Sequence, residues 1–167
     1  VRNLPTTTAW RIGFQSANLI LERHLQDHGD HLRQLGLSVW GTATMRTGGD
    51  DIAQAMALMG VRPVWATGSQ RVDDFEILPL SLLDRPRVDV TLRVSGFFRD
   101  AFANLIRLFD AAVQAVAALD EPPDMNPLAA KVRSEREALL ASGLEAAAAA
   151  RQAGWRIFGA KPGAYGA

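Results

Sequence analysis

The chain has 167 residues, 18 basic and 18 acidic side chains, and zero cysteines. Its length is that of one ordinary domain, and its balanced charge excludes the broad positive field that draws in nucleic acid or an anionic membrane surface. The lack of cysteine excludes disulfides, thiolate catalysis and cysteine-ligated metal sites. It also fits a reducing compartment, so we expect a cytoplasmic location.

The sequence contains no apolar run long enough to span a bilayer, and residues 1–13 lack the basic start and apolar stretch of a signal peptide. The chain begins without Met, and its glycine-rich last residues, 163–167, close no recognisable element. We therefore expect residues 1–167 to form a single domain, or a fragment of the core of a much larger protein, without a membrane span.

The first third of the chain predicts a helix, a strand and a second helix. Apolar residues at helical spacing indicate a long helix over residues 6–35, in which Gly29 is a point where the helix can break. Residues 37–41 form a short apolar run that is typical of a buried strand. We expect a polar, glycine-containing loop over residues 42–49 and a helix over residues 50–59.

The middle of the chain predicts further strands and then the strongest helix. Residues 61–65 and 71–77 are strand candidates, and residues 88–94 alternate apolar with polar side chains, as a half-buried strand does. A continuous apolar stripe predicts one helix over residues 98–119.

The last third of the chain is rich in helix. Pro127 can open a helix, and the alanine-rich stretch 135–153 favours helix by propensity, with Gly143 as a point of interruption. Strands that alternate with helices predict an α/β fold with a mainly parallel sheet flanked by helices and a helix-rich C-terminal part.

Six sequence blocks occur together in a fixed order. They are WGTATMRTGGDDIAQ (40–54), GVRPVW (60–65), RPRVDVT (85–91), SGFFRDAF (95–102), LDEP (119–122) and FGAKPGAYG (158–166). Together they resemble the large, tetrapyrrole-binding subunit of ATP-dependent cobaltochelatases and, more loosely, the H subunit of magnesium chelatases. The last block favours the cobalt branch, because the magnesium branch has a serine-rich variant there.

The resemblance implies a metal chelatase, a ligase that forms nitrogen–metal bonds. The full subunit of that family binds a corrin precursor, hydrogenobyrinic acid a,c-diamide, and inserts Co²⁺ as the metal substrate for cobalamin biosynthesis. Partner AAA+ subunits hydrolyse the ATP, which is consistent with the lack of a Gly-x-x-x-x-Gly-Lys-Ser/Thr loop in this chain. We expect a fragment of this kind to be inactive alone.

Metal insertion needs a group that takes pyrrole protons or guides the metal. Asp50 is our catalytic candidate because it stands where a glycine loop enters a helix, although many relatives have the longer Glu at this position. The alternative is that Asp50 and Asp51 stabilise the positive end of the helix, with Thr47 as its cap. For Asp51 we prefer this alternative.

Cationic and hydroxyl side chains are expected to hold the acid groups of the substrate. Arg46 and Thr42 lie in the loop after the first strand, and Ser95 follows a later strand, where α/β proteins bind ligands. The remaining substrate-binding candidates are Arg99, Lys161 and Tyr165. For Arg99 the alternative is an internal ion pair such as one with Asp100, and for Lys161 and Tyr165 it is a plain turn.

Other groups attract attention but favour structural explanations. His24, His28 and His31 share one helical face, yet acidic and polar residues alternate with them, so we expect a solvated surface and leave the metal-contacting residues unassigned. The phenylalanines 97, 98, 102 and 109 are expected to belong to the core. Two alternatives remain open: a chelatase-like tetrapyrrole-binding or scaffold protein without insertion activity, and a magnesium chelatase H subunit.

Overall fold

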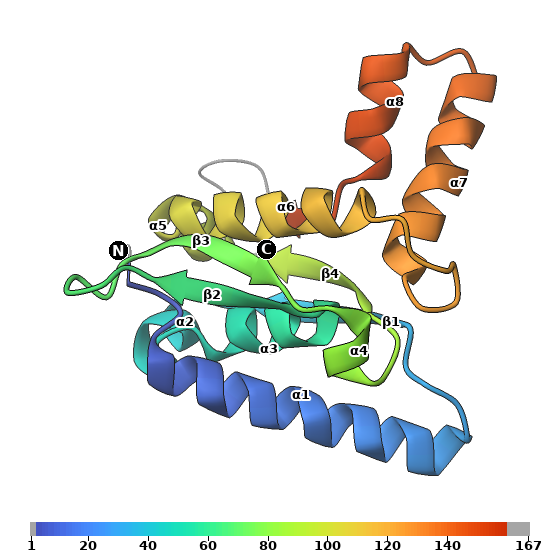
Figure 1. Ribbon diagram of the computed structural model, residues 1–167. Coiled ribbons are helices and arrows are strands. Elements are labelled where there is room, and N and C mark those ends of the chain that lie inside the picture. Colours follow the sequence, from blue (N-terminus) through green and yellow to red (C-terminus); the bar gives the residue numbers. More distant parts are fainter. Residues whose placement is uncertain (1–2, 160–167) are drawn as a thin grey trace.

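The computed structural model describes residues 3–159 (Figure 1). The helices are α1 Thr7–His28, α2 Gly41–Thr47, α3 Asp50–Met59, α4 Leu80–Leu83, α5 Gly96–Ala101, α6 Ala103–Ala117, α7 Pro127–Ala141 and α8 Ala146–Ala153. The strands are β1 Gln34–Val39, β2 Val61–Trp65, β3 Val72–Ile77, β4 Asp89–Val94 and β5 Ile157–Gly159. The expected α/β fold with a helix-rich C-terminal part is confirmed.

The main sheet has three parallel strands in the order β1-β4-β5, which confirms the expected parallel sheet. Leu37 pairs with Leu92, which pairs in turn with Ile157, so these three side chains share one face. That face belongs to the hydrophobic core, and α3 contacts both β1 and β4. The core therefore lies on one side of this sheet.

The strands β2 and β3 exist as expected, but they form a separate antiparallel hairpin rather than joining the parallel sheet. The connection between them is short, and the amide of Ala66 donates to the carbonyl of Arg71 across the turn at 2.8 Å. A short connection permits antiparallel pairing, whereas parallel strands need a crossover of a dozen or more residues. Trp65 anchors the hairpin by donating its indole N–H to the carbonyl of Pro5 at 3.0 Å.

The first helix ends where the sequence allowed it to break. The hydroxyl of Thr6 accepts from the amide of Ala9, and Gly29 ends α1 in the left-handed conformation at φ 72°. The chain then enters β1 before residue 35, so the expectation of helix through Leu35 is wrong for its last residues.

The predicted loop over residues 42–49 is wrong in its first part, which forms α2. The amide of Gly41 donates to the hydroxyl of Ser95, and the hydroxyl of Thr44 bonds the carbonyl of Trp40. Gly48 ends this helix at φ 79°. A tertiary hydrogen bond at the first residue thus stabilises a helix that has little intrinsic preference to form.

The single helix expected over residues 98–119 is two helices, α5 and α6, separated at Phe102. This residue leaves helical geometry (φ −122°, ψ 43°), and its buried ring packs against Phe98 with 5.4 Å between ring centroids. Core packing of the aromatic ring thus accompanies the break. The expected helix start at Pro127 is confirmed, with Asn126 as its cap, and so is the interruption at Gly143.

None of the helices within residues 3–159 is both long enough and apolar enough to cross a membrane.

Candidate functional site

The carboxyl ends of β1 and β4 lie side by side, because Val39 pairs with Val94 at the last position of each strand. Helix α2 begins directly after β1 and helix α5 directly after β4, and the two helices contact each other. This edge is where open α/β sheets bind ligands. The sequence predicted ligand-binding residues here because Arg46 and Ser95 lie in segments that follow predicted strands.

Ser95 ties the two strand ends together. Its hydroxyl oxygen accepts the amide of Gly41 at 3.2 Å and the amide of Phe98 at 3.1 Å. Gly41 needs to be glycine, because a Cβ there would lie 2.4 Å from the ring of Phe97. The hydroxyl of Ser95 therefore has a structural task in capping α5, and only its hydrogen is left to meet a ligand.

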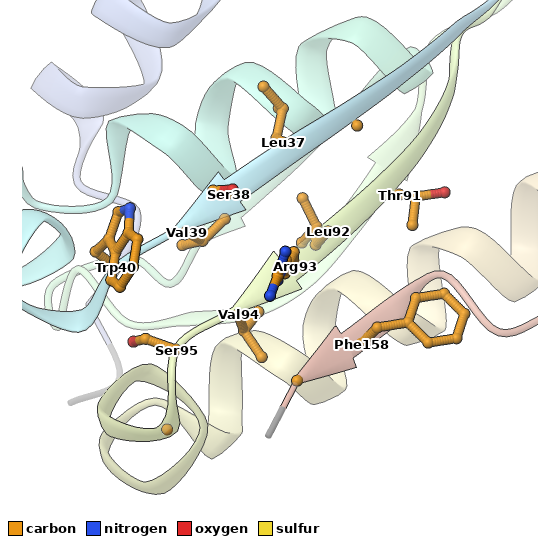
Figure 2. A pocket seen from close by; sticks show the side chains of 13 residues that line it. Leu37, Ser38, Val39, Trp40, Thr91, Leu92, Arg93, Val94, Ser95 and Phe158 are labelled. Carbon is orange, nitrogen blue, oxygen red and sulfur yellow. The ribbon is translucent and has the colours of Figure 1, made fainter. Parts of the chain in front are cut away.

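A cavity of about 1050 Å³ opens beside this edge (Figure 2). Its lining comes from β1, β4 and β5 and from the residues that follow β1 and β4: Gly36, Leu37, Ser38, Val39, Trp40, Thr91, Leu92, Arg93, Val94, Ser95, Gly96, Phe158 and Gly159. Trp40 is 59% exposed and Phe158 49% exposed, so both rings present apolar surface to solvent. The sequence analysis did not single out Trp40, Arg93 or Phe158.

Thr42 and Arg46 are both exposed on α2, Thr42 at its amino end and Arg46 in its last turn. Since α2 rises about 1.5 Å per residue, Thr42 and Arg46, four residues apart, are separated along the helix axis by about 6 Å. The structure thus brings Thr42 near Ser95 at the strand ends and leaves Arg46 nearer to the start of α3.

Asp50 begins α3 and is half-buried. The hydroxyl of Thr47 accepts the amides of Gly49 and Asp50, each at 3.3 Å. Gly49 is the N-cap of α3, and this helix start has no side-chain cap bond within the described residues, so Thr47 is not the cap that the structural alternative required. The carboxylate of Asp50 makes neither a hydrogen bond nor an ion pair with any residue in the range 3–159.

Burial raises the pKa of the Asp51 carboxyl above its ordinary value, and the negative charge of Asp50 adds to the rise. A carboxyl in this setting ionises less readily than one in water.

Arg99 is half-buried on α5, and its Nε donates to Asp100 at 3.2 Å, so the internal pair considered as an alternative is present. Both terminal nitrogens of Arg99 are buried without a hydrogen-bond partner among the described residues. They belong to a second hollow of about 400 Å³, which Arg107 and the exposed Trp155 also line. The pair with Asp100 therefore leaves most of the guanidinium donors of Arg99 unused. Lys161 and Tyr165 lie outside the described residues.

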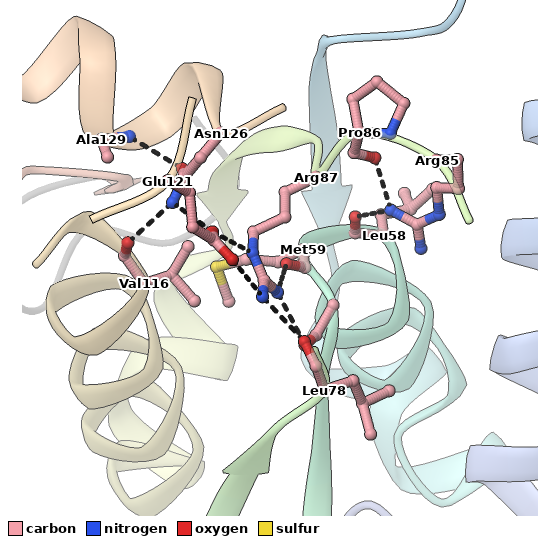
Figure 3. A network of polar contacts seen from close by, with 11 residues as sticks. Leu58, Met59, Leu78, Arg85, Pro86, Arg87, Val116, Glu121, Asn126 and Ala129 are labelled. Carbon is pink, nitrogen blue, oxygen red and sulfur yellow. Dashed lines mark hydrogen bonds and ion pairs between the residues drawn. The ribbon is translucent and has the colours of Figure 1, made fainter. Parts of the chain in front are cut away.

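A different set of charged residues surrounds the carboxyl end of α3 (Figure 3). The buried guanidinium of Arg87 donates to both carboxylate oxygens of Glu121, at 2.8 and 3.1 Å, and to the carbonyls of Met59, Gly60 and Leu78. Asn126 donates to the same carboxylate and caps α7. These charges bond one another and the backbone, so we assign them to the fold.

Arg85 and Arg156 also have structural partners. Arg85 donates to the carbonyls of Leu58 and Ala57 at the end of α3, and burial, with the positive charge of Arg87, lowers its pKa to about 10. Arg156 forms a buried bidentate pair with Asp89, at 2.7 and 3.2 Å. The sequence blocks 85–91 and 119–122 thus supply contacts inside the molecule.

The rings of His24 and His28 lie 4.4 Å apart on α1. His31 lies beyond the end of this helix at Gly29, so the expectation that all three histidines share one helical face is wrong for His31. Within the described part of the chain, no group of three or more His, Asp or Glu side chains is placed to hold a metal ion. Phe98, Phe102 and Phe109 are buried as expected for core residues, whereas Phe97 is 38% exposed.

Comparison with known proteins identifies the family. The CobN/Magnesium Chelatase family model matches residues 1–167. The chain belongs to this family. It is 85% identical over its whole length to the aerobic cobaltochelatase subunit CobN of Pseudomonas aeruginosa and 58% identical over 99% of its length to the CobN subunit of a Sinorhizobium species.

A solved structure agrees with the fold. The catalytic subunit of cobaltochelatase from Mycobacterium tuberculosis matches 99% of this chain with a TM-score of 0.88 and 47% sequence identity. The chain spans 13% of the length of each CobN relative and 14% of the solved chain. The family resemblance inferred from the sequence blocks is confirmed.

Proposed function

We propose that this chain works as part of the tetrapyrrole-binding, metal-inserting subunit of an ATP-dependent cobaltochelatase. Co²⁺ is the metal substrate, hydrogenobyrinic acid a,c-diamide is the acceptor, and AAA+ partner subunits hydrolyse the ATP. The observation that carries the proposal is the carboxyl edge of the parallel sheet, where the ends of β1 and β4 lie beside a large cavity. The identity of 85% to a named cobaltochelatase subunit supports the cobalt branch.

Asp50 is the proposed catalytic residue. Insertion removes the protons of the pyrrole N–H groups, so a nearby carboxylate that accepts protons or guides the incoming metal accelerates the step. The carboxylate of Asp50 has no bonding partner among residues 3–159, so its oxygens are available to a substrate.

Arg46, Thr42, Ser95 and Arg99 are the proposed substrate-binding residues, together with Lys161 and Tyr165. A guanidinium offers a planar pair of donors that matches the geometry of a carboxylate. Arg99 has the clearest structural support, since its two terminal nitrogens are without a partner among the described residues. Arg46 is exposed beside the start of α3.

The test is a reconstituted insertion assay with a full-length subunit that contains this chain. The subunit is mixed with AAA+ partner subunits, ATP, Co²⁺ and hydrogenobyrinic acid a,c-diamide, and the absorbance change of the corrin reports insertion. We expect multiple turnovers that require both ATP and the partners. A parallel reaction with Mg²⁺ and a porphyrin is expected to give none.

Two outcomes would overturn the proposal in different ways. Corrin binding without insertion under all conditions would identify a carrier or scaffold protein. Insertion of Mg²⁺ into the porphyrin at a rate above that of Co²⁺ into the corrin would identify a magnesium chelatase H subunit.

A further inference from the structure

The two faces of the parallel sheet differ in chemistry. On the core face, the side chains of β1 and β4 are all apolar: Leu35, Leu37, Val39, Val90, Leu92 and Val94. On the other face, the alternate positions carry Gln34, Gly36, Ser38, Asp89, Thr91 and Arg93, and all of these except the buried Asp89 are exposed or half-exposed. We call this second surface the open face.

The open face has a floor of small residues. Gly36 and Ser38 lie two residues apart on β1. Gly36 pairs with Thr91 on β4, and Ser38 pairs with Arg93. A Cβ added at Gly36 would meet nothing within 4 Å, so the backbone is accessible from this side. A flat molecule can therefore approach the sheet closely.

Aromatic and cationic side chains surround this floor (Figure 2). Trp40 follows β1, and Phe158 on β5 pairs in register with Arg93 on the central strand. Arg93 is exposed and makes no ion pair within residues 3–159, since Asp89 on the same face is already bonded to Arg156. The open face thus presents one uncompensated positive charge between two exposed rings.

A covering layer of helices fits this face poorly. Parallel strands that are covered on both faces read as nearly continuous apolar runs, whereas β1 and β4 alternate. A helix on the open face would bury Arg93 and gain little apolar contact from Gly36, Ser38 and Thr91. The surface instead matches a ligand with broad apolar faces and acidic groups at its rim.

We propose that the open face binds the tetrapyrrole macrocycle, with the ring over Gly36, Ser38 and Thr91 and a ring carboxylate paired with Arg93. This inference rests on the proposed function and assigns its substrate a position. Trp40 and Phe158 contact the apolar surface of the ring from two sides. The cavity of about 1050 Å³ is at the upper end of ligand pockets, which measure roughly 300–1,000 Å³.

The first test compares two ligands in a full-length subunit that contains this chain. The ligands are hydrogenobyrinic acid a,c-diamide and the same corrin with its remaining carboxylates converted to amides. We expect the wild-type subunit to prefer the acid, and Arg93→Gln to weaken binding of the acid about tenfold while losing this preference, since a charge-assisted hydrogen bond is removed. Arg23→Gln, which makes the same charge change on the exposed surface of α1, is the control and is expected to bind both ligands as the wild type does.

The second test measures access to the open face. Ser38→Cys in the full-length subunit is treated with a maleimide, and labelling is read by peptide mass spectrometry, with Gln26→Cys on α1 as the exposed control. We expect labelling of residue 38 without ligand and protection by the corrin. Protection without ligand would mean that polypeptide covers the face, and labelling that the corrin leaves unchanged would place the ring elsewhere. Either result overturns the inference.

The two proposals fail in different ways. A wild-type subunit that binds neither corrin contradicts the proposed function. A wild-type subunit that binds the acid corrin, while Arg93→Gln keeps full affinity and preference, contradicts only the position assigned here.

Discussion

Charged residues from the six sequence blocks lie at both ends of α3, but the two ends differ in how these charges are hydrogen-bonded. At the carboxyl end, Arg87 uses its donors on Glu121 and on three backbone carbonyls. At the amino end, the hydroxyl of Thr47 accepts the amide of Asp50, and the carboxylate of Asp50 is left without a partner among residues 3–159. The charge at the carboxyl end is thus bonded within the molecule, whereas the carboxylate at the amino end keeps its oxygens free of such bonds.

This difference separates charges that stabilise the fold from charges that can meet a substrate. A buried ion is tolerated only when its hydrogen bonds are satisfied, which is the situation of Arg87. A half-buried acid with free lone pairs, as Asp50 is at the start of α3, keeps its bonding capacity for a ligand. A sequence block shared with an enzyme family can therefore belong to either class, and the bonding partners decide which.

The largest effect is expected at the carboxyl end of α3. Arg87→Met in the full-length subunit leaves the partly buried Glu121 and three backbone carbonyls without the guanidinium, and we expect local stability to fall by about 3 kcal/mol. Hydrogen exchange at the amides of β4 measures this opening free energy. Arg62→Met is the matched control, because its ion pair with Glu76 is 44% and 52% exposed and should contribute less than about 1 kcal/mol. Equal losses in the two variants would contradict the assignment.

At the amino end, Asp50→Asn should lower cobalt insertion about 100-fold, because a proton acceptor or metal guide is removed, and leave corrin affinity nearly unchanged. Asn keeps the shape of the side chain, so the helix end is preserved. Absorbance reports insertion, and fluorescence quenching reports binding. Asp51→Asn is the control and should insert normally. Normal turnover in Asp50→Asn would return Asp50 to a role at the helix end alone.

Arg46→Ala should weaken corrin binding about tenfold and leave turnover at saturating corrin unchanged, since the guanidinium contacts a carboxylate in the ground and transition states alike. The dissociation constant from fluorescence quenching is the measurement. Arg23→Ala, an exposed arginine on α1, controls for the loss of charge. Unchanged affinity in Arg46→Ala would place the carboxylate contact on other residues.

The smallest effect is expected for His24 and His28 of α1 and for His31 after it, which are partly or fully exposed. Replacing His24, His28 and His31 together by Gln should keep cobalt insertion within about threefold, since exposure alone does not make a site. The insertion assay over a range of Co²⁺ concentrations checks this. Loss of turnover that excess Co²⁺ restores would instead assign a metal-handling role to this face.

Periodicity predicted the elements that have long apolar stripes and missed those that depend on distant contacts. The alternation in residues 88–94 correctly indicated β4, and the glycines at 29 and 143 correctly marked breaks. Helix α2 was missed because its first amide bonds the hydroxyl of Ser95, far along the chain. Strand β5 has three residues, too few for any periodic signal.

The site was predictable only in part for the same reason. The positions of Thr42 and Ser95 after predicted strands indicated that they lie at the strand ends, and adjacency in sequence suggested the pair of Arg99 with Asp100. The bond of Arg87 to Glu121 joins distant segments, so its structural role could not be read locally. The alternation of β4 held an unused signal, since it already placed Thr91 and Arg93 on the face opposite to the core.

The strand order affects when the parts of the fold can form during synthesis of the chain. The central strand β4 pairs with β1, which the ribosome produces much earlier, and with β5, which it produces much later. The α1–α3 and β2–β3 contacts join nearer segments and can form while synthesis continues. Long-range parallel pairing is slow because loop closure precedes any gain in contacts. The sheet that carries the ligand edge is therefore the last part of the described chain to be completed, after Arg156 emerges and joins Asp89.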